Sequence, residues 1–342
     1  MGQIDPGRWY QGTLNANFSF FSSLPLLRKT PIMEHSKPTG AYAVRLKYPG
    51  LRSGLIVPGH IPKNLEKASH CRGDVMHIEL EDGVPDDRKQ EARETTTKAL
   101  KELNWSGKLT LVRVNCVESG FLEDDIEVVA HGRPTAFLLA KAQGPDDIKY
   151  LDHLIGRAEK KAKLEPGSIK IASMIERARA LQKIDEIATA SPRMMALYTG
   201  ATDLSTEVGY RRTYKGQELE VSWYRSRIVF AAHCAEILAI DSPTTYYKDL
   251  EDSLVQAKWA YHLGFDAKTC VSPRQIDAVN KGFTPSDDDV AWAKKIFEGK
   301  KVAEAQGLSV WVSDGMMVDE AFIARATQIL ALHEKSLDDP KE

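Results

Sequence analysis

The chain lacks the features that mark secreted, membrane-spanning or nucleic-acid-binding proteins. Its 342 residues contain only four cysteines, and these are far apart and form no Cys-x-x-Cys pair. The sequence therefore predicts neither a disulfide framework nor a cysteine metal site, and it favours a reducing compartment such as the cytoplasm. No apolar run is long enough to span a bilayer, so no membrane partner is expected. A net charge of −2 provides no basic surface for nucleic acid.

A glycine-rich dinucleotide loop is also absent. The first apolar run leads into Val57-Pro58-Gly59-His60, which lacks the Gly-x-Gly-x-x-Gly spacing. This argues against a doubly wound nucleotide-binding sheet. The nine histidines do not cluster at the spacing of metal ligands. With 42% hydrophobic and 27% charged residues, the chain has the composition of an ordinary globular protein.

The first fifty residues differ from the rest of the chain. They contain few acids, and an aromatic and aliphatic stretch, Phe18–Leu27, precedes Arg28 and Lys29. We interpret residues 1–50 as an N-terminal extension or docking arm. Their basic, serine-containing character is also typical of an organelle transit peptide, so a mitochondrial location is the alternative to the cytoplasm.

From residue 51 to residue 283, apolar runs alternate with amphipathic segments. The runs lack polar alternation, as expected of strands with both faces buried. The predicted strands are Gly54–Val57, Val75–Leu80, Leu109–Val114, Ala136–Ala140, Ile169–Ile175, Met194–Tyr198, Ile237–Ile240 and Ala267–Val271. The predicted helices are Pro62–His70, Asp86–Leu103, Leu122–Ala130, Pro145–Ala162, Arg177–Ala190, Leu219–Ala235 and Lys248–Leu263. Eight strands with intervening helices predict a (β/α)₈ TIM barrel.

The chain continues beyond the eighth strand, which a closed barrel does not require. Ser286 precedes three aspartates, the pattern of a helix N-cap, and predicts a helix to about Glu304. An apolar run, a turn at residues 313–315 and a helix from Met316 to about His333 follow. We expect residues 284–342 to form a helical lid or an oligomerisation segment.

Two carboxylates follow neighbouring predicted strands. Glu176 ends the fifth strand, and Asp203 comes shortly after the sixth. In an α/β barrel the carboxyl ends of the strands form the active-site face. Because no cysteine or histidine cluster lies nearby, the pair predicts a site for a hard cation such as Mg²⁺. The alternative for Glu176 is an acid that begins its helix.

Three acids and an arginine occupy the ends of the second and third strands. Arg113 lies near the end of the third strand, where it can bind a substrate carboxylate with two parallel hydrogen bonds. Alternatively, it pairs with an internal acid from Glu79, Glu81 or Asp82. These acids either bind substrate or a metal-bound water, or they hold Arg113. Asp82-Gly83 alone is also a common turn sequence.

These segments together resemble the citrate lyase β-subunit-like family of the HpcH/HpaI aldolase superfamily, which includes malyl-CoA, citramalyl-CoA and β-methylmalyl-CoA lyases. The resemblance runs from Arg52 to the last predicted helix. Its motifs are RSGLIVPG at 52–59, ELEDGV at 79–84, VRVN at 112–115, MIE at 174–176, ASPR at 190–193, GATDL at 200–204 and NKGFTPS at 280–286.

The resemblance implies a magnesium-dependent barrel, usually trimeric or hexameric, that cleaves or forms a carbon–carbon bond beside a CoA thioester. Its substrates would be small molecules, an acyl-CoA and a 2-oxo acid, with Mn²⁺ as an alternative metal. Glu176 and Asp203 match the metal ligands and Arg113 the substrate-binding residue. Asp319 matches an acid that the C-terminal segment brings over a neighbouring subunit's site. Considered without the family, Asp319 is an ordinary helix-terminal charge.

Three basic residues are candidates for the CoA phosphates, namely Arg52, Lys63 and Lys268. The chain also departs from the family pattern. Glu79 stands where the family usually has Asp, Arg177 follows the acid of the fifth strand in place of a small residue, and Ser272 interrupts the usual ending of the last strand. These departures concern the choice of substrate and leave the predicted metal pair intact.

The residues leave four functions open. A CoA-ester lyase is preferred. A malyl-CoA-type thioesterase, a magnesium-dependent aldolase for free 2-oxo acids and a catalytically silent assembly subunit are the alternatives. The presence of Glu176, Asp203 and Arg113 argues against the last of these.

Overall fold

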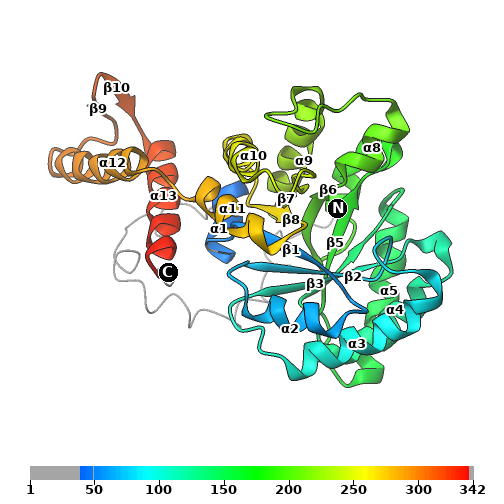
Figure 1. Cartoon of the computed structure of the whole chain (residues 1–342). Coiled ribbons are helices and arrows are strands. Elements are labelled where there is room, and N and C mark those ends of the chain that lie inside the picture. Colours follow the sequence, from blue (N-terminus) through cyan, green and yellow to red (C-terminus); the bar gives the residue numbers. More distant parts are fainter. Residues whose placement is uncertain (1–38, 49, 339–342) are drawn as a thin grey trace, which may run out of the picture. The chain divides into compact units, whose positions relative to one another are not determined.

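The computed structural model describes residues 39–48 and 50–338 (Figure 1). Most of the predicted N-terminal extension, and with it the transit-peptide interpretation, lies outside this part of the chain. Within the described residues, no helix has both the length and the apolar character needed to cross a membrane.

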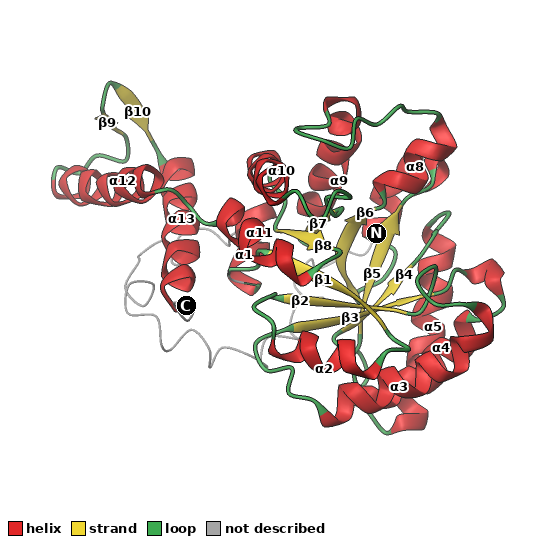
Figure 2. Ribbon diagram, viewed as in Figure 1, coloured by secondary structure: helices red, strands yellow, loops and turns green. Residues whose placement is uncertain are grey.

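Eight parallel strands form a closed barrel, which confirms the predicted fold class (Figure 2). The strands are β1 (Ser53–Pro58), β2 (Val75–Glu79), β3 (Leu109–Val114), β4 (Ala136–Leu139), β5 (Lys170–Ile175), β6 (Met194–Thr199), β7 (Leu238–Asp241) and β8 (Ala267–Cys270). Each strand pairs with the next in sequence, and β1 pairs with β8. All eight therefore end at the same face of the barrel.

Helices separate the strands. They are α2 (Pro62–His70), α3 (Lys89–Glu102), α4 (Leu122–Val129), α5 (Pro145–Ala162), α6 (Ala178–Gln182), α7 (Ile184–Ala188), α8 (Ala201–Val208), α9 (Ser222–Cys234), α10 (Leu250–Leu263) and α11 (Ile276–Phe283). The single helix predicted over 177–190 is two short helices, because Lys183 between them has non-helical dihedrals of φ −107° and ψ 20°. The sequence analysis missed α8 and α11.

Alternation along the strands divides the core into two layers. Val75, Leu111 and Ala172 belong to a cluster inside the barrel, whereas their neighbours Met76, Val112 and Ile171 belong to the layer between strands and helices. Successive side chains of a strand point to opposite faces. Glu79, Arg113 and Glu176 lie an even number of residues after these interior residues on their strands. Their side chains therefore also point toward the barrel axis, at its carboxyl end.

Residues just before the first strand close the opposite end of the barrel. Helix α1 (Gly40–Lys47) places Val44 in the interior cluster, together with Leu51. Both side chains are buried. Residues 40–51 therefore pack as part of the barrel, although the predicted boundary assigned them mainly to the extension.

The C-terminal segment consists of α12 (Asp287–Ala305), a two-stranded hairpin of β9 (Trp311–Ser313) and β10 (Met316–Val318), and α13 (Glu320–Asp338). Ser286 caps α12 as predicted, accepting the Asp289 N–H at 3.1 Å. The prediction that the last helix begins at Met316 is wrong. Asp314 and Gly315 both have positive φ, which allows a tight two-residue hairpin turn, so Met316–Val318 pairs with the preceding strand.

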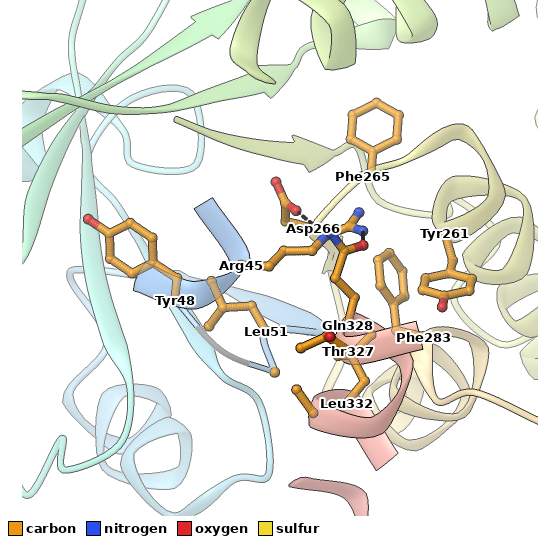
Figure 3. Close-up of a pocket in the computed structure, with 12 residues that line it drawn as sticks. Arg45, Tyr48, Leu51, Tyr261, Phe265, Asp266, Phe283, Thr327, Gln328 and Leu332 are labelled. Atoms are coloured by element: carbon orange, nitrogen blue, oxygen red, sulfur yellow. Dashed lines mark hydrogen bonds and ion pairs between the residues drawn. The ribbon is translucent and has the colours of Figure 1, made fainter. Parts of the chain in front are cut away.

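Arg45 connects this segment to the barrel. Its Nε lies 3.0 Å from Asp266 Oδ1, and its Nη1 donates to Gln328 Oε1 of α13 at 2.9 Å. Figure 3 shows Arg45 reaching between these two side chains in a pocket lined by Tyr48, Phe283 and others. Asp266 precedes β8, so this pocket lies near the amino ends of the strands, away from the predicted active-site face.

Candidate active site

The structure brings together charged residues at the carboxyl end of the barrel. Arg113 of β3 lies beside Glu79 of β2 and Glu81, which follows it. Glu176 follows β5 and accepts a hydrogen bond from the backbone of Lys141, which follows β4. Charged groups from four consecutive strands thus meet at one edge.

Arg113 holds two acids at once. Its Nε lies 2.7 Å from Glu79 Oε2, and its Nη2 lies 3.1 Å from Glu81 Oε2. Burial alone would lower the pKa of Arg113, but the charges of Glu79, Glu81 and Glu176 raise it above its ordinary value. Arg113 is therefore paired with internal acids, which is one of the two interpretations of this residue. The guanidinium also lies at the barrel mouth, so the substrate interpretation stays open.

Glu176 is almost fully buried, and its Oε1 accepts the Lys141 N–H at 2.7 Å. Burial raises its pKa to about 7, helped by the charges of Asp203 and Glu81 and opposed by Arg113 and the Lys141 N–H. Gly200 makes room for this carboxylate, because a Cβ there would lie 2.2 Å from Glu176 Cβ and 2.7 Å from Oε2. A glycine at the end of β6 is thus a packing requirement of the site.

Asp203 lies in the first turn of α8 and is partly exposed. Helix α8 follows β6, the strand that pairs with β5, and the charge of Asp203 contributes to the raised pKa of Glu176. Among the residues that the structure describes, no three His, Cys, Asp or Glu side chains form a group that could hold a metal ion. A cation at this site would thus take protein ligands from the two acids and its others from water or substrate, a coordination that Mg²⁺ accepts.

Lys141 is a site residue that the sequence analysis missed. Its ammonium lies 2.5 Å from Glu81 Oε1 and 2.8 Å from Asp82 Oδ1. The available signal was its position two residues after the fourth strand, the same kind of position that drew attention to Glu176. Glu81 and Asp82, predicted to contact substrate, are thus held by Lys141 in this structure.

Two of the three residues proposed for CoA are inaccessible. Arg52 is buried, precedes β1 at the amino end of the barrel, and contacts Asp74 at 3.3 Å. Lys268 is also buried, with its ammonium 2.9 Å from Asp241 Oδ2. Because neither side chain offers a surface to a phosphate, we exclude both from the proposed CoA site.

The third residue, Lys63, is exposed in the first turn of α2, which follows the carboxyl end of β1. Its position is compatible with a phosphate contact. Arg177, which departs from the family pattern, extends toward Glu207 of α8, with Nη1 3.6 Å from Oε2.

Asp319 is not joined to this cluster. Its carboxylate accepts the Ala321 N–H at 3.0 Å, as a residue at the start of α13 can. In the described part of the chain, no hydrogen bond or ion pair connects Asp319 with Arg113, Glu176 or Asp203.

A parallel α/β barrel with acids and a guanidinium at its carboxyl face has the arrangement of an enzyme active site, because barrels of this kind carry their active sites at that face. Comparison with known proteins identifies the class of enzyme. Residues 52–273 match the HpcH/HpaI aldolase/citrate lyase family, and the chain belongs to this family.

Curated relatives agree with this assignment. The chain is 30% identical over 281 residues to citrate lyase subunit beta of Leuconostoc mesenteroides subsp. cremoris, covering 82% of this chain and 92% of the relative. It is 31% identical over 298 residues to L-malyl-CoA/beta-methylmalyl-CoA lyase of Cereibacter sphaeroides, covering 82% and 93%. Both relatives are named as lyases, which supports a lyase activity for the family to which this chain belongs.

A solved structure supports the same fold. Protein CitE from Mycobacterium tuberculosis, in complex with magnesium, acetoacetate and coenzyme A, superposes with a TM-score of 0.68 at 27% identity. The match covers 84% of this chain and 99% of CitE.

Proposed function

We propose that this chain is a magnesium-dependent CoA-ester lyase, which cleaves or forms the bond between the α-carbon of an acyl-CoA and the carbonyl carbon of a 2-oxo acid. The observation that carries the proposal is that Arg113, the buried Glu176 and Asp203 all lie at the carboxyl end of the barrel, where their charges act on one another. The names of the lyase relatives and the magnesium and coenzyme A of the CitE complex support it.

The donor set fits Mg²⁺. Glu176 and Asp203 offer carboxylate oxygens, the ligands that hard cations prefer. Of the two Glu176 oxygens, Oε1 accepts the Lys141 N–H, whereas Oε2 accepts no hydrogen bond from the described residues. When bound, the metal would polarise the hydroxyl or carbonyl oxygen of the substrate. Mn²⁺ takes similar oxygen ligands and is the alternative metal.

The protein residues would orient and neutralise the substrate. Arg113 would bind the carboxylate of the 2-oxo acid or the oxygen that becomes negative as the bond breaks. Fixed by Glu79 and Glu81, its guanidinium is oriented before the substrate arrives. Lys63 would contact a CoA phosphate. In the synthetic direction a base must remove a proton from the thioester α-carbon, and Asp319 of a second subunit is our candidate.

We also propose that the chain forms homotrimers or homohexamers. The β9–β10 hairpin exposes Val312 by 71% and Met317 by 64%. An exposed two-stranded hairpin is marginally stable alone, and a second copy of the chain would cover it. A cytoplasmic location, with a mitochondrial one as alternative, stays a prediction.

The test is incubation of the purified protein with a panel of acyl-CoAs and 2-oxo acids, with and without Mg²⁺, followed by mass spectrometry. A lyase condenses a pair of these compounds, or splits the product, only when the metal is present. Release of free CoA without carbon–carbon bond change would establish a thioesterase instead. Products from 2-oxo acids alone would establish a CoA-independent aldolase, and no reaction with any pair would refute catalysis on this panel.

A further inference from the structure

We propose that Lys141 is a positioning residue that acts both on Glu176 and on the acids beside Arg113. Its backbone N–H orients Glu176. Its ammonium neutralises Glu81 and Asp82, so that these acids do not offset the positive charge of Arg113, which can then attract the carboxylate of a 2-oxo acid. The inference rests on the proposed lyase function and deepens it.

The backbone of Lys141 adopts an unfavourable conformation. Its φ is +51°, in the left-handed region that residues with a Cβ seldom occupy. Two other residues with positive φ have a local reason, since Lys163 ends α5 and Asp314 forms the hairpin turn. Lys141 ends no helix. Its conformation instead directs its N–H to Glu176 Oε1 at 2.7 Å, and strain of this kind is typical of functional sites.

The side chain makes a second, separate set of contacts. Nζ lies 2.5 Å from Glu81 Oε1, and it donates to both Asp82 oxygens at 2.8 and 3.0 Å. The other oxygen of Glu81 lies 3.1 Å from Arg113 Nη2. Glu81 thus binds one cation with each oxygen, and it links Lys141 to Arg113.

Charge balance makes this link important for an anionic substrate. Without Lys141, the carboxylates of Glu79, Glu81 and Asp82 would face Arg113 alone. At a partly buried barrel mouth, interactions between charges a few ångströms apart are poorly screened. The three acids would then offset the charge of Arg113 and repel an incoming carboxylate. Burial alone would raise the pKa of Asp82, but hydrogen bonds from Lys141 help to hold it below its ordinary value.

Two variants test the side chain while leaving the backbone contact in place. Lys141→Met removes the ammonium but keeps an unbranched side chain of similar length, and Lys141→Gly removes it while relieving the positive φ. Both keep the N–H. We expect both to retain Mg²⁺ binding, measured by titration calorimetry, and to raise the KM for the 2-oxo acid by about tenfold or more, as expected for loss of a charge-assisted interaction. Lys141→Arg keeps the charge and should recover part of the loss.

A compensating variant tests the charge argument directly. Glu81→Gln removes one acid, so E81Q combined with K141M should bind the 2-oxo acid more tightly than K141M alone. The matched control is Lys149, an exposed lysine that pairs with Asp146. The K149M variant should behave as wild type. Thermal melting of each variant establishes that it is folded.

The outcomes are distinct. An unchanged KM in a folded K141M protein, or no improvement on adding E81Q, would overturn the role of Lys141 while leaving the lyase proposal intact. A wild-type protein without lyase activity on any acyl-CoA would instead refute the proposed function itself.

Discussion

Arg113 contacts two carboxylates through two separate nitrogens, Nε toward Glu79 and Nη2 toward Glu81. The single nitrogen of a lysine cannot reproduce this planar arrangement. We predict that Arg113→Lys keeps the fold but lowers kcat/KM by about 10- to 100-fold, the scale of one or two charged hydrogen bonds. Steady-state kinetics with a melting curve would measure both effects. Near-normal turnover would show that Arg113 has only a structural role.

A second residue-scale prediction concerns Asp241, which is buried between Arg225 at 2.6 Å and Lys268 at 2.9 Å. Burial alone would raise its pKa, but the two cations lower it to about 2. Because the folded pKa lies below the unfolded value of about 3.9, the carboxylate stabilises the fold above that value, and this contribution is lost as pH falls toward 2. Asp241→Asn should cost about 3–5 kcal/mol at neutral pH, since it leaves buried cations without their partner.

Urea unfolding at several pH values would measure this. The stability difference between wild type and D241N should be largest near neutral pH and shrink in acid. Asp146, an exposed partner of Lys149, is the control, and D146N should change little at any pH. A D241N protein as stable as wild type at neutral pH would contradict the prediction.

Individual site residues were predictable to different degrees. Glu176 and Asp203 stand out because each acid follows an apolar run, and parallel strands place both at the same face of the barrel. Lys141 also follows a strand, but a lysine at such a position is an ordinary surface residue until its partners are known. Arg52 and Lys268 were misjudged because their partners, Asp74 and Asp241, are remote in sequence.

At the scale of elements, strands were easier to predict than the segments between them. Eight buried apolar runs specify the barrel, because both faces of each strand need apolar cover. The short helices were not predicted, because they are stabilised by packing and lack a strong sequence pattern. The hairpin was missed because Met316–Val318 is apolar and precedes a helix, while the deciding feature is the backbone of Asp314-Gly315.

The hairpin is attached to α12 through a glycine. At Gly299 an added Cβ would lie 2.3 Å from Nε1 of Trp311, so the indole rests directly on the helix backbone. We predict that Gly299→Ala displaces the hairpin and increases amide hydrogen exchange over residues 311–318. The matched control is Gly156→Ala in α5, where nothing lies within 4 Å of the added Cβ. G156A should stabilise the protein by about 0.5–1 kcal/mol, since alanine favours the helix. Unchanged exchange in G299A would show that the hairpin tolerates the methyl group.

At the scale of the whole molecule, one acid of the proposed site lies apart from the others. The barrel supplies Arg113, Glu176 and Asp203, whereas Asp319 caps α13 and, among the described residues, makes no hydrogen bond or ion pair with them. The adjacent hairpin exposes apolar side chains, and we propose that another subunit covers them. If Asp319 acts on a neighbouring site, activity depends on the oligomer.

Mixing two inactive variants tests this dependence. Glu176→Gln removes a proposed metal ligand, and Asp319→Asn removes the proposed base while asparagine can still cap the helix. Each variant alone should be inactive. Mixed oligomers, formed by subunit exchange, should contain sites that combine an intact Glu176 from one chain with an intact Asp319 from another, and these sites should regain activity. Exchange can be followed with differently tagged chains. If subunits exchange and no activity returns, Asp319 acts within its own chain or takes no part in the reaction.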